Sequence, residues 1–567
     1  MSAELALAVV SVVDICIKLA NKTLRICQAF RTAKKDLCDK VLLLETIWTK
    51  LEIQLVFLRG IKDHLTEELA QCHFDLLQRL RGTLLQAVSQ LEAAASSIVA
   101  STSTGQGQVL TRMLQLDRWR YAVAKRGLDA LMTELQCWQS LFDPSWYTIM
   151  LIGGKVLDPA LQQLGQDRSR QLPHSQSPAS PLDHMFALRK AIDYTINTDI
   201  RSANSIVMDE TGWDFTTATS IPFSSVNVVA RPESQSLYIM EGIGIAPNTN
   251  TNTTSDAHQL CRRLQSVDPS IFGLLRCRGL IEIIDDNKTF PPGPQIVYHT
   301  PAQADPLKPP TTLRSLLLEQ RPVCLSSVIV LAKQLVRSVS FVHTCDLVHK
   351  NIRPDNILLF PTALAALRPL ELGQAFLVGF SQFRSINMET NRLGDTAWYR
   401  NLYRHPARQG LCILERYVMQ HDIYSLGVCL LEIGLWRSLV WYPSTSSSTS
   451  STYHHPNHAN SSSSVPTPVP GYSLQLRKHL SDRDFEHAHL PGSTSWIKED
   501  LVLLAKQTLP QRMGRLYTEI VVDCLTCLDD GNNEFGSSDV THNKQDLIVV
   551  GIKFVERILG KIEGITL

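Results

Sequence analysis

Apolar residues recur at helical spacing through the first 150 residues, and short polar breaks divide them into long segments. Apolar side chains at every third or fourth position, with no proline before Pro144, predict four long helices. Asp143 and Pro144 fit the N-cap and N1 positions of a short fifth helix. The expected helices span 3–30, 34–59, 65–100, 110–142 and 143–153. Because short loops join long antiparallel helices in bundles, residues 1–157 are expected to form an all-α bundle.

The pattern changes after a polar stretch rich in Gln, Ser and Pro over 158–181, which predicts a linker. Short apolar runs then predict strands at 205–208, 225–230, 237–240, 279–284 and 295–299, with a helix over 256–267. Helices dominate from 306 onward and are expected at 325–343, 422–436, 496–507, 514–528 and 545–562. A low-complexity run of Ser, Thr, Pro and His predicts a disordered insert over 444–470. The chain is therefore expected to be multidomain, with an α+β domain over 182–567.

Composition narrows the class of protein. With 567 residues, 44% of them hydrophobic and 19% charged, the chain can bury the cores of two or three domains. A net charge of +1 argues against a nucleic-acid binder. Residues 1–21 lack signal-peptide features, and the 13 cysteines form no disulfide-type pattern, so a cytoplasmic location is expected. His454, His455 and His458 surround Pro456 without an interleaved carboxylate or cysteine, so no metal site is expected.

A helix, a tight polar loop and a short apolar strand follow one another between 335 and 360. The loop reads LVHKNIRPDN, and 20 to 30 residues later a strand leads into Gly379, Phe380 and Ser381. This region resembles the protein-kinase fold, because HKNIRPDN matches the catalytic-loop pattern and GFS stands where a kinase carries D-F-G. The resemblance implies a bilobal domain with a small lobe at about 182–305 and a large lobe at about 306–567. It also implies a degenerate catalytic loop, whose residues are His349, Lys350, Asn351 and Arg353.

The departures from the kinase pattern fall on the residues that perform chemistry. Asn351 replaces the carboxylate that accepts the substrate proton, and Gly379 replaces the carboxylate that holds magnesium. Asn356 matches the second metal-binding residue, so Asn356, Gly379 and Phe380 are degenerate nucleotide and metal positions. No glycine-rich phosphate loop is recognisable. The resemblance gives Asp422, which opens the sequence DIYSLGV, a structural role in bracing the catalytic loop.

The strand expected to carry the kinase lysine reads LYIME over 237–241, without a lysine. The following helix, 256–267, contains no Glu that could pair with such a lysine. The ion pair that positions nucleotide phosphates in kinases is therefore expected to be missing. No cofactor is expected. ATP with magnesium is an expected ligand only if kinase activity is retained.

The N-terminal half carries a second resemblance. An apolar first helix, an Arg-containing turn at 31–35 and a second helix with Trp48 resemble the fungal HeLo and HeLo-like domains. These bundles belong to cell-death and incompatibility systems and are similar to the executioner bundle of mixed-lineage kinase domain-like protein. The resemblance implies partner proteins or self-association through the bundle, and an anionic membrane surface as a further partner. Residues 1–19, which are almost uncharged, are the part expected to act on a membrane or on sister chains.

Three functions fit these features. The first is a signalling pseudokinase with an executioner bundle, recruited from the cytoplasm to a membrane on activation, in a fungal cell-death or non-self-recognition pathway. The second is an active, atypical Ser/Thr kinase that binds ATP. The third is a non-enzymatic adaptor that binds partner proteins. Phosphate transfer by the purified protein separates the second from the others, and liposome permeabilisation separates the first from the third.

Overall fold

The structure is a computed structural model that describes most of two regions of the chain. Its described residues lie within 3–142 and 206–565, apart from gaps at 29–34, 62–66, 97–125, 128, 139–141, 211, 232–235, 244–251, 284–289, 291–292, 306–307, 345–346, 363–370, 386–392, 413–415, 444–466, 472–482, 484–493, 530–534, 536–549 and 552. The chain divides into two compact units. Unit 1 comprises Met1–Ile196 with Gly551–Thr566, and unit 2 comprises Asn197–Val550 with Leu567.

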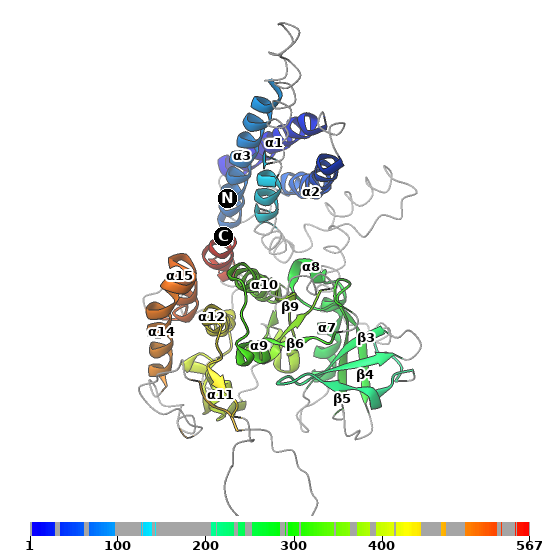
Figure 1. Cartoon of the computed structure of the whole chain (residues 1–567), viewed down its shortest axis with the longest axis vertical. Coiled ribbons are helices and arrows are strands. Elements are labelled where there is room, and N and C mark those ends of the chain that lie inside the picture. The colour runs from blue at the N-terminus through cyan, green and yellow to red at the C-terminus, as the bar shows by residue number, and fades with distance from the viewer. Residues whose placement is uncertain are drawn as a thin grey trace, which may run out of the picture. The chain divides into compact units, whose positions relative to one another are not determined.

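Unit 1 is helical and contains α1 (Ala3–Gln28), α2 (Lys35–Gly60) and α3 (Glu67–Ser96) (Figure 1). These bounds confirm the first three predicted helices to within a few residues. The predicted fourth helix is described as helical at 126–127, 129–138 and 142, whereas the predicted fifth helix and the linker lie outside the described residues. The described helices agree with the expectation that the N-terminal half is helical.

Helix α1 packs against α3 and α2 through one apolar face. That face recurs at three- and four-residue spacing and consists of Ala6, Val9, Val13, Cys16 and Ala20, all buried. Leu7 lies outside it, with 62% of its surface exposed. Ion pairs link the polar sides of the helices, between Asp14 and Arg59 at 2.9 Å and between Lys22 and Glu92 at 2.7 Å. In this structure the apolar face of the N-terminal helix therefore contributes to a packed helical core.

Residues 551–566, near the C-terminus, belong to unit 1. They form a π-helical turn, η11 (Val555–Leu559), followed directly by α17 (Gly560–Glu563). The sequence pattern of this segment predicts only an amphipathic helix, which is expected to belong to the domain at 182–567. Residues 551–566 instead group with the helical unit by their contacts. Local periodicity specifies that a face is buried but not which partner buries it, and this accounts for the difference.

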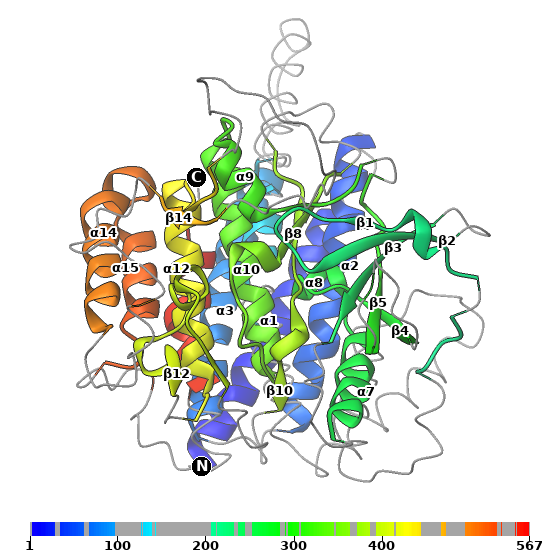
Figure 2. The ribbon, with the colours of Figure 1, turned by 90° about the horizontal axis from the view of Figure 1, so that it is seen from below.

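Unit 2 begins with a five-stranded antiparallel sheet in the order β1-β2-β3-β5-β4 (Figure 2). Its strands and its neighbouring helices are β1 (Thr219–Ser220), β2 (Val226–Arg231), β3 (Ser236–Gly242), β4 (Cys277–Ile283), β5 (Gly293–His299), α7 (Asn252–Gln265) and α8 (Pro269–Phe272). One face of the sheet is filled by apolar side chains that include Phe215, Val229, Met240, Ile281 and Val297. Four of the five predicted strands are confirmed, whereas 205–208 forms only an isolated bridge, between Val207 and Leu280.

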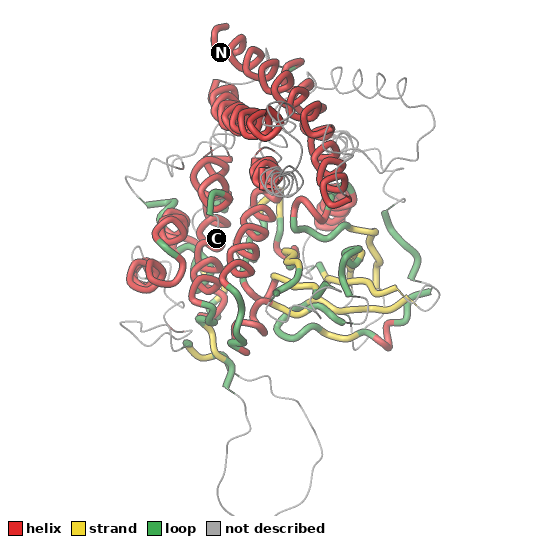
Figure 3. Tube along the Cα trace, turned by 45° about the horizontal axis from the view of Figure 1, so that its top comes forward, coloured by secondary structure: helices red, strands yellow, loops and turns green. Residues whose placement is uncertain are grey.

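The rest of unit 2 is mainly helical, and Figure 3 shows its helices beside the strands of the first part. The longer helices are α9 (Leu313–Glu319), α10 (Leu325–Thr344), α12 (Met419–Leu435), α14 (Ser495–Met513) and α15 (Arg515–Leu525), with a short α11 (Trp398–Asn401). A small sheet, β6 (Thr311–Thr312), β8 (Ile357–Phe360) and β9 (Gln374–Leu377), lies next to α10. Two-stranded pairs join β7 (Leu347–Val348) to β10 (Arg384–Ser385), and β11 (Leu393–Asp395) to β12 (Gly410–Cys412).

The predicted disordered insert requires a correction at its C-terminal end. Val469 and Pro470 form a strand, β14, that pairs with β13 (Val440–Trp441). Gly471 continues the contact by donating a hydrogen bond to the carbonyl of Leu439 at 2.8 Å. The insert predicted from composition therefore ends a few residues too late. Residues 444–466 lie outside the described residues.

Helix α10 is long and apolar enough to span a membrane by length and composition, and it is the one such helix among the described residues. Most of its span-length window, Leu325–His343, is buried inside unit 2. Because α10 packs against α12 and β9, its apolar composition is that of a core helix.

Candidate functional site

Asp422, on the first turn of α12, contacts the backbone of the loop that joins β7 to β8. The carboxylate accepts hydrogen bonds from the backbone amides of His349 at 2.7 Å and Lys350 at 2.9 Å. The hydroxyl of Tyr417 donates a third, at 2.6 Å. Lys350 adopts a left-handed backbone conformation with φ of 66°, so these contacts hold the loop in a sharp turn.

Asp422 is fully buried and nevertheless stays ionised. Burial alone would raise the pKa of this carboxyl, but the hydrogen bond and charge of His343, with the contributions of His349 and Tyr417, lower the pKa below its ordinary value. The Nε2 of His343 lies 3.2 Å from Asp422 Oδ2. A buried charge with several donors is a structural anchor, since removing it leaves amide donors without acceptors.

Asn351 and Asn356, both in this loop, lie close to Gly379, although 28 residues separate Asn351 from Gly379. The side-chain amide of Asn356 donates to the carbonyl of Asn351 at 2.7 Å, and the side-chain amide of Asn351 donates to the carbonyl of Gly379 at 3.2 Å. The backbone amide of Val378 donates to the carbonyl of Asn356 at 2.9 Å. The three sequence-predicted positions are thus brought together, and they provide two neutral side-chain amides and a glycine rather than carboxylates.

Both the backbone conformation at residue 379 and the space around it require a glycine. Its φ of 93° lies in the left-handed region, where residues with a side chain are strained. A Cβ at this position would lie 2.3 Å from Cγ of Asn356, well inside van der Waals contact. The local structure is therefore built around the absence of a side chain at 379.

Glu241 is a functional candidate that the sequence analysis did not select. It lies near the end of β3, where the lysine was expected, and its side chain is fully buried. Its Oε2 accepts hydrogen bonds from the backbone amide of Gly379 at 3.1 Å and from the hydroxyl of Tyr298 at 3.2 Å. The sequence signal for Glu241 is its charge at the end of the apolar run LYIME. The local pattern does not show what this side chain contacts.

The electrostatics of Glu241 follow from its burial. Burial raises the pKa of the carboxyl to about 7, although hydrogen bonds from Gly379, Tyr298 and the amides of Phe380 and Ser381 act in the opposite direction. Burial first, then the neighbouring Cys277 and last the charge of Glu241 raise the pKa of the Cys261 thiol, on α7. The strand expected to carry the kinase lysine therefore carries a buried carboxyl instead.

The ring of His349 packs on Phe380, with 4.6 Å between ring centroids. Both residues are buried, and burial lowers the pKa of His349 to about 4. His349 is thus neutral near pH 7 and contributes to packing rather than to proton transfer. Its Nδ1 accepts a hydrogen bond from the backbone amide of Asn351 at 3.3 Å.

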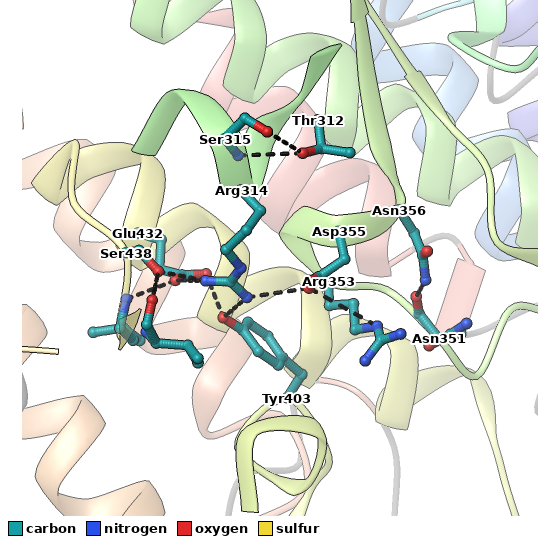
Figure 4. A network of polar contacts seen from close by, with 12 residues as sticks. Thr312, Arg314, Ser315, Asn351, Arg353, Asp355, Asn356, Tyr403, Glu432 and Ser438 are labelled. Atoms are coloured by element: carbon teal, nitrogen blue, oxygen red, sulfur yellow. Dashed lines mark hydrogen bonds and ion pairs between the residues drawn. The ribbon is translucent and has the colours of Figure 1, made fainter. Parts of the chain in front are cut away.

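Arg314 of α9 is the centre of a buried polar network on the other side of the loop (Figure 4). Its guanidinium lies 3.2 Å from Asp355 and 3.0 Å from Glu432, and it donates to the hydroxyl of Tyr403 at 2.7 Å. Arg353, from the predicted catalytic loop, lies 3.9 Å from the same Asp355 carboxylate. Four segments of unit 2 are thereby tied together, and Asp355 and Arg353 participate in a structural network.

The turn between β1 and β2 is held against the helical part of unit 2. The ring of Phe223, at the tip of the turn, packs on Tyr442 with 4.8 Å between centroids. The hydroxyl of Thr312 donates a hydrogen bond to the carbonyl of Pro222 at 3.0 Å. These contacts fix the position of the β1–β2 turn within unit 2.

Within the described part of the chain, no three His, Cys, Asp or Glu side chains are grouped as metal ligands would be. The predicted metal position, Asn356, offers one amide, whose nitrogen already donates to Asn351. His454, His455 and His458 lie outside the described residues.

The fold and this site describe a helical unit joined to a mixed α/β unit whose loop carries a catalytic-loop pattern without carboxylates at two key positions. No family model matches the chain. The chain is 31% identical over 103 residues to the serine/threonine-protein kinase ATG1 of Mycosarcoma maydis. The alignment covers 18% of this chain and 10% of that kinase, so the chain spans about a tenth of its relative's length. The protein is thus kinase-like over part of its sequence.

Proposed function

We propose that the protein is a signalling pseudokinase, in which unit 2 has a bilobal kinase-like fold without phosphotransfer and unit 1 is the output module. The observation that carries this proposal is the buried Glu241 carboxyl, which contacts the amide of Gly379 where a kinase would have a lysine facing the nucleotide phosphates.

Phosphotransfer needs a base and a metal-holding carboxylate. Asn351 is an amide without useful basicity, and its nitrogen donates to the carbonyl of Gly379. Gly379 has no side chain to hold magnesium, and its surroundings leave no room for one. Removing one such residue in well-studied enzymes lowers turnover by about 10⁴-fold, so the combined losses favour an inactive protein.

Nucleotide binding is disfavoured by charge. A triphosphate carries several negative charges, and kinases neutralise them with a lysine and magnesium. Glu241 contributes a further negative charge whenever it is ionised, and the amides that it contacts are no longer available to a phosphate. The expected consequence is weak binding of ATP that does not require magnesium.

The arrangement of these segments is stabilised by contacts within unit 2. Glu241 accepts the amide of Gly379, and Phe223 and Pro222 hold the β1–β2 turn to Tyr442 and Thr312. A pseudokinase built in this way would keep one conformation without a ligand, and its changes of state would be driven by partner proteins.

The test of this function is phosphate transfer by the purified full-length chain, measured with labelled ATP and a mixture of kinase substrates. We expect transfer at the level of a heat-treated control. Transfer above that level that is abolished by Asn356→Ala would instead establish the active, atypical kinase.

Unit 1 is proposed to provide the output, by self-association or by contact with an anionic membrane, as in a cell-death or non-self-recognition pathway. The apolar helix α1 and the likeness to HeLo-type domains support this role. Dye release from anionic liposomes by the full-length chain tests it, with a chain that begins at Asn21 and retains its helix content as the comparison. Equal release from both chains, or release from neither, would favour the adaptor.

A further inference from the structure

The helix α11 and the residues after it carry two arginines that share one carboxylate. Arg400 contacts Asp395 through two guanidinium nitrogens, Nε at 2.8 Å and Nη2 at 3.1 Å. Arg404 lies 3.6 Å from the same carboxylate and donates a hydrogen bond to the side-chain oxygen of Asn401 at 3.3 Å. The charge of Asp395 is therefore engaged by Arg400, and Arg404 has no carboxylate within hydrogen-bond distance in the described part of the chain.

A third arginine, Arg353, belongs to the same region of unit 2. Its guanidinium lies 3.9 Å from Asp355, which Arg314 approaches more closely, at 3.2 Å. Arg314 also contacts Tyr403, the residue before Arg404, so these contacts connect Arg353 to the segment after α11. Figure 4 shows the guanidinium of Arg353 directed away from Arg314. The Nε of Arg353 is buried and has no hydrogen-bond partner among the described residues.

Arg353 and Arg404 are thus half-buried cations without a close counter-ion. Their side chains are 21% and 18% exposed, so each has lost much of its hydration and still reaches the surface. Burial lowers the pKa of Arg404, and the charges of Arg400 and Arg353 act in the same direction, against that of Asp395. Because a partly dehydrated cation is costly unless an anion pairs with it, an anion beside these arginines would be bound favourably.

The backbone that carries Arg404 is held in place by the chain itself. The side-chain amide of Gln409 donates hydrogen bonds to the carbonyls of Asn401 at 2.9 Å and Arg404 at 2.7 Å. The hydroxyl of Ser425, on α12, donates to the carbonyl of Tyr403 at 2.7 Å. A guanidinium on a fixed backbone loses less freedom on binding, and its planar fork matches two oxygens of a phosphoryl group.

An exposed leucine lies beside the arginines and indicates the kind of ligand. Leu411, on β12, is 51% exposed, and its neighbour Gly410 pairs with Asp395 on β11. A polypeptide segment can place a phosphoryl group and an apolar side chain at adjacent positions, whereas inorganic phosphate would leave the leucine uncovered. A flat bilayer surface approaches exposed groups, whereas Arg353 and Arg404 are mostly buried, so a single extended side chain fits them better.

We propose that Arg353, Arg400 and Arg404 form a binding site for a phosphorylated segment of a partner protein. The phosphoryl group lies among the three guanidinium groups, and an apolar side chain of the segment covers Leu411. This inference goes beyond the proposed function. Binding at this site neither needs nor excludes phosphate transfer, so the result of the phosphate-transfer test leaves it standing.

Binding is measured by fluorescence polarisation with the full-length chain and a labelled mixture of short peptides that carry phosphoserine followed by leucine. The same mixture with unmodified serine is the matched probe. We expect the phosphorylated mixture to bind at least about ten times more tightly, because hydrogen bonds between charged groups each contribute about this factor. Arg353→Gln and Arg400→Gln should each weaken binding about tenfold, whereas Arg515→Gln, which changes a 92% exposed arginine on α15, should leave it unchanged.

Thermal denaturation must show that each variant is folded, and Arg353→Lys, which keeps the charge but not the planar fork, replaces Arg353→Gln if that chain unfolds. Inorganic phosphate and phosphatidylcholine vesicles containing phosphatidylinositol bisphosphate test other sources of the phosphoryl group. Binding of either one that depends on Arg400, without binding of the phosphorylated peptides, would overturn the proposal. Equal binding of the two peptide mixtures, binding of neither, or equal weakening by Arg515→Gln would overturn it as well.

Discussion

At the scale of single residues, the ionisation of Glu241 makes the stability of unit 2 depend on pH. Its pKa is raised to about 7 in the folded chain, chiefly by burial, from an ordinary value of 4.5. A folded-state pKa above the unfolded one means that the folded chain binds more protons between these values. Its contribution to stability is therefore fully present below about pH 4.5 and is lost as the pH rises through 7.

Glu241→Gln should remove this pH dependence. In the unmodified chain, this pKa shift corresponds to a loss of stability on the order of 3 kcal/mol between pH 5 and 8. A neutral amide does not ionise in this range, so the variant does not lose this stability. Urea denaturation of unit 2 at several pH values measures the slope, with Glu319→Gln at an exposed position as the control. The same slope in Glu241→Gln as in the control would contradict the assignment.

Asp422→Asn should destabilise unit 2 although it removes no chemistry. An amide turns at least one donor toward the amides of His349 and Lys350, which leaves a buried donor without an acceptor and lowers the free energy of unfolding by about 1–3 kcal/mol. Thermal denaturation measures the change. Tyr417→Phe, which removes only the hydroxyl donor, should have a smaller effect, and an Asn variant as stable as the parent would disprove the bracing role.

At the scale of elements, most helices and strands were predictable because each has a strong pattern of its own. The helix at 325–343, the strand at 357–360 and the strand at 295–299 lie within two residues of their observed bounds. The clustering of Asn351, Asn356 and Gly379 was predictable only through the kinase resemblance. The contact of Glu241 with Gly379 and the placement of the C-terminal helix were not predictable, since both depend on long-range contacts.

Helix α3 carries a buried histidine that should make unit 1 sensitive to acid. His73 is fully buried, neither ring nitrogen has a hydrogen-bond partner within the described part of the chain, and burial lowers its pKa to about 3. The unfolded chain therefore binds more protons below pH 6.5, so stability is fully present above 6.5 and is lost as the pH falls toward 3.

His73→Leu should reduce this loss. At pH 5 the unmodified unit has lost about 2 kcal/mol relative to pH 8, and the variant lacks that contribution. Helix melting by circular dichroism at the two pH values provides the measurement. An equal decrease in melting temperature on acidification in both chains would show that His73 is not the group responsible.

At the scale of the whole molecule, the two units have separate cores, so a ligand of unit 2 should be detected in the unfolding of unit 2. Ligand stabilisation grows with concentration over Kd. With ATP and magnesium at millimolar concentrations we expect no shift in melting temperature beyond that given by ATP alone, because Gly379 offers no carboxylate to the metal. A shift of several degrees that disappears with a chelator would contradict the proposed loss of the nucleotide site.

The conformation of Gly379 also has a consequence for the history of the chain. A single substitution to Asp at this position would combine a left-handed backbone, disfavoured by about 1–2 kcal/mol, with a collision against Asn356. This single substitution would therefore produce a less stable protein. A carboxylate at residue 379 would therefore require concurrent changes at Asn356 and in the backbone of this turn, so single substitutions are expected to leave glycine at this position unchanged.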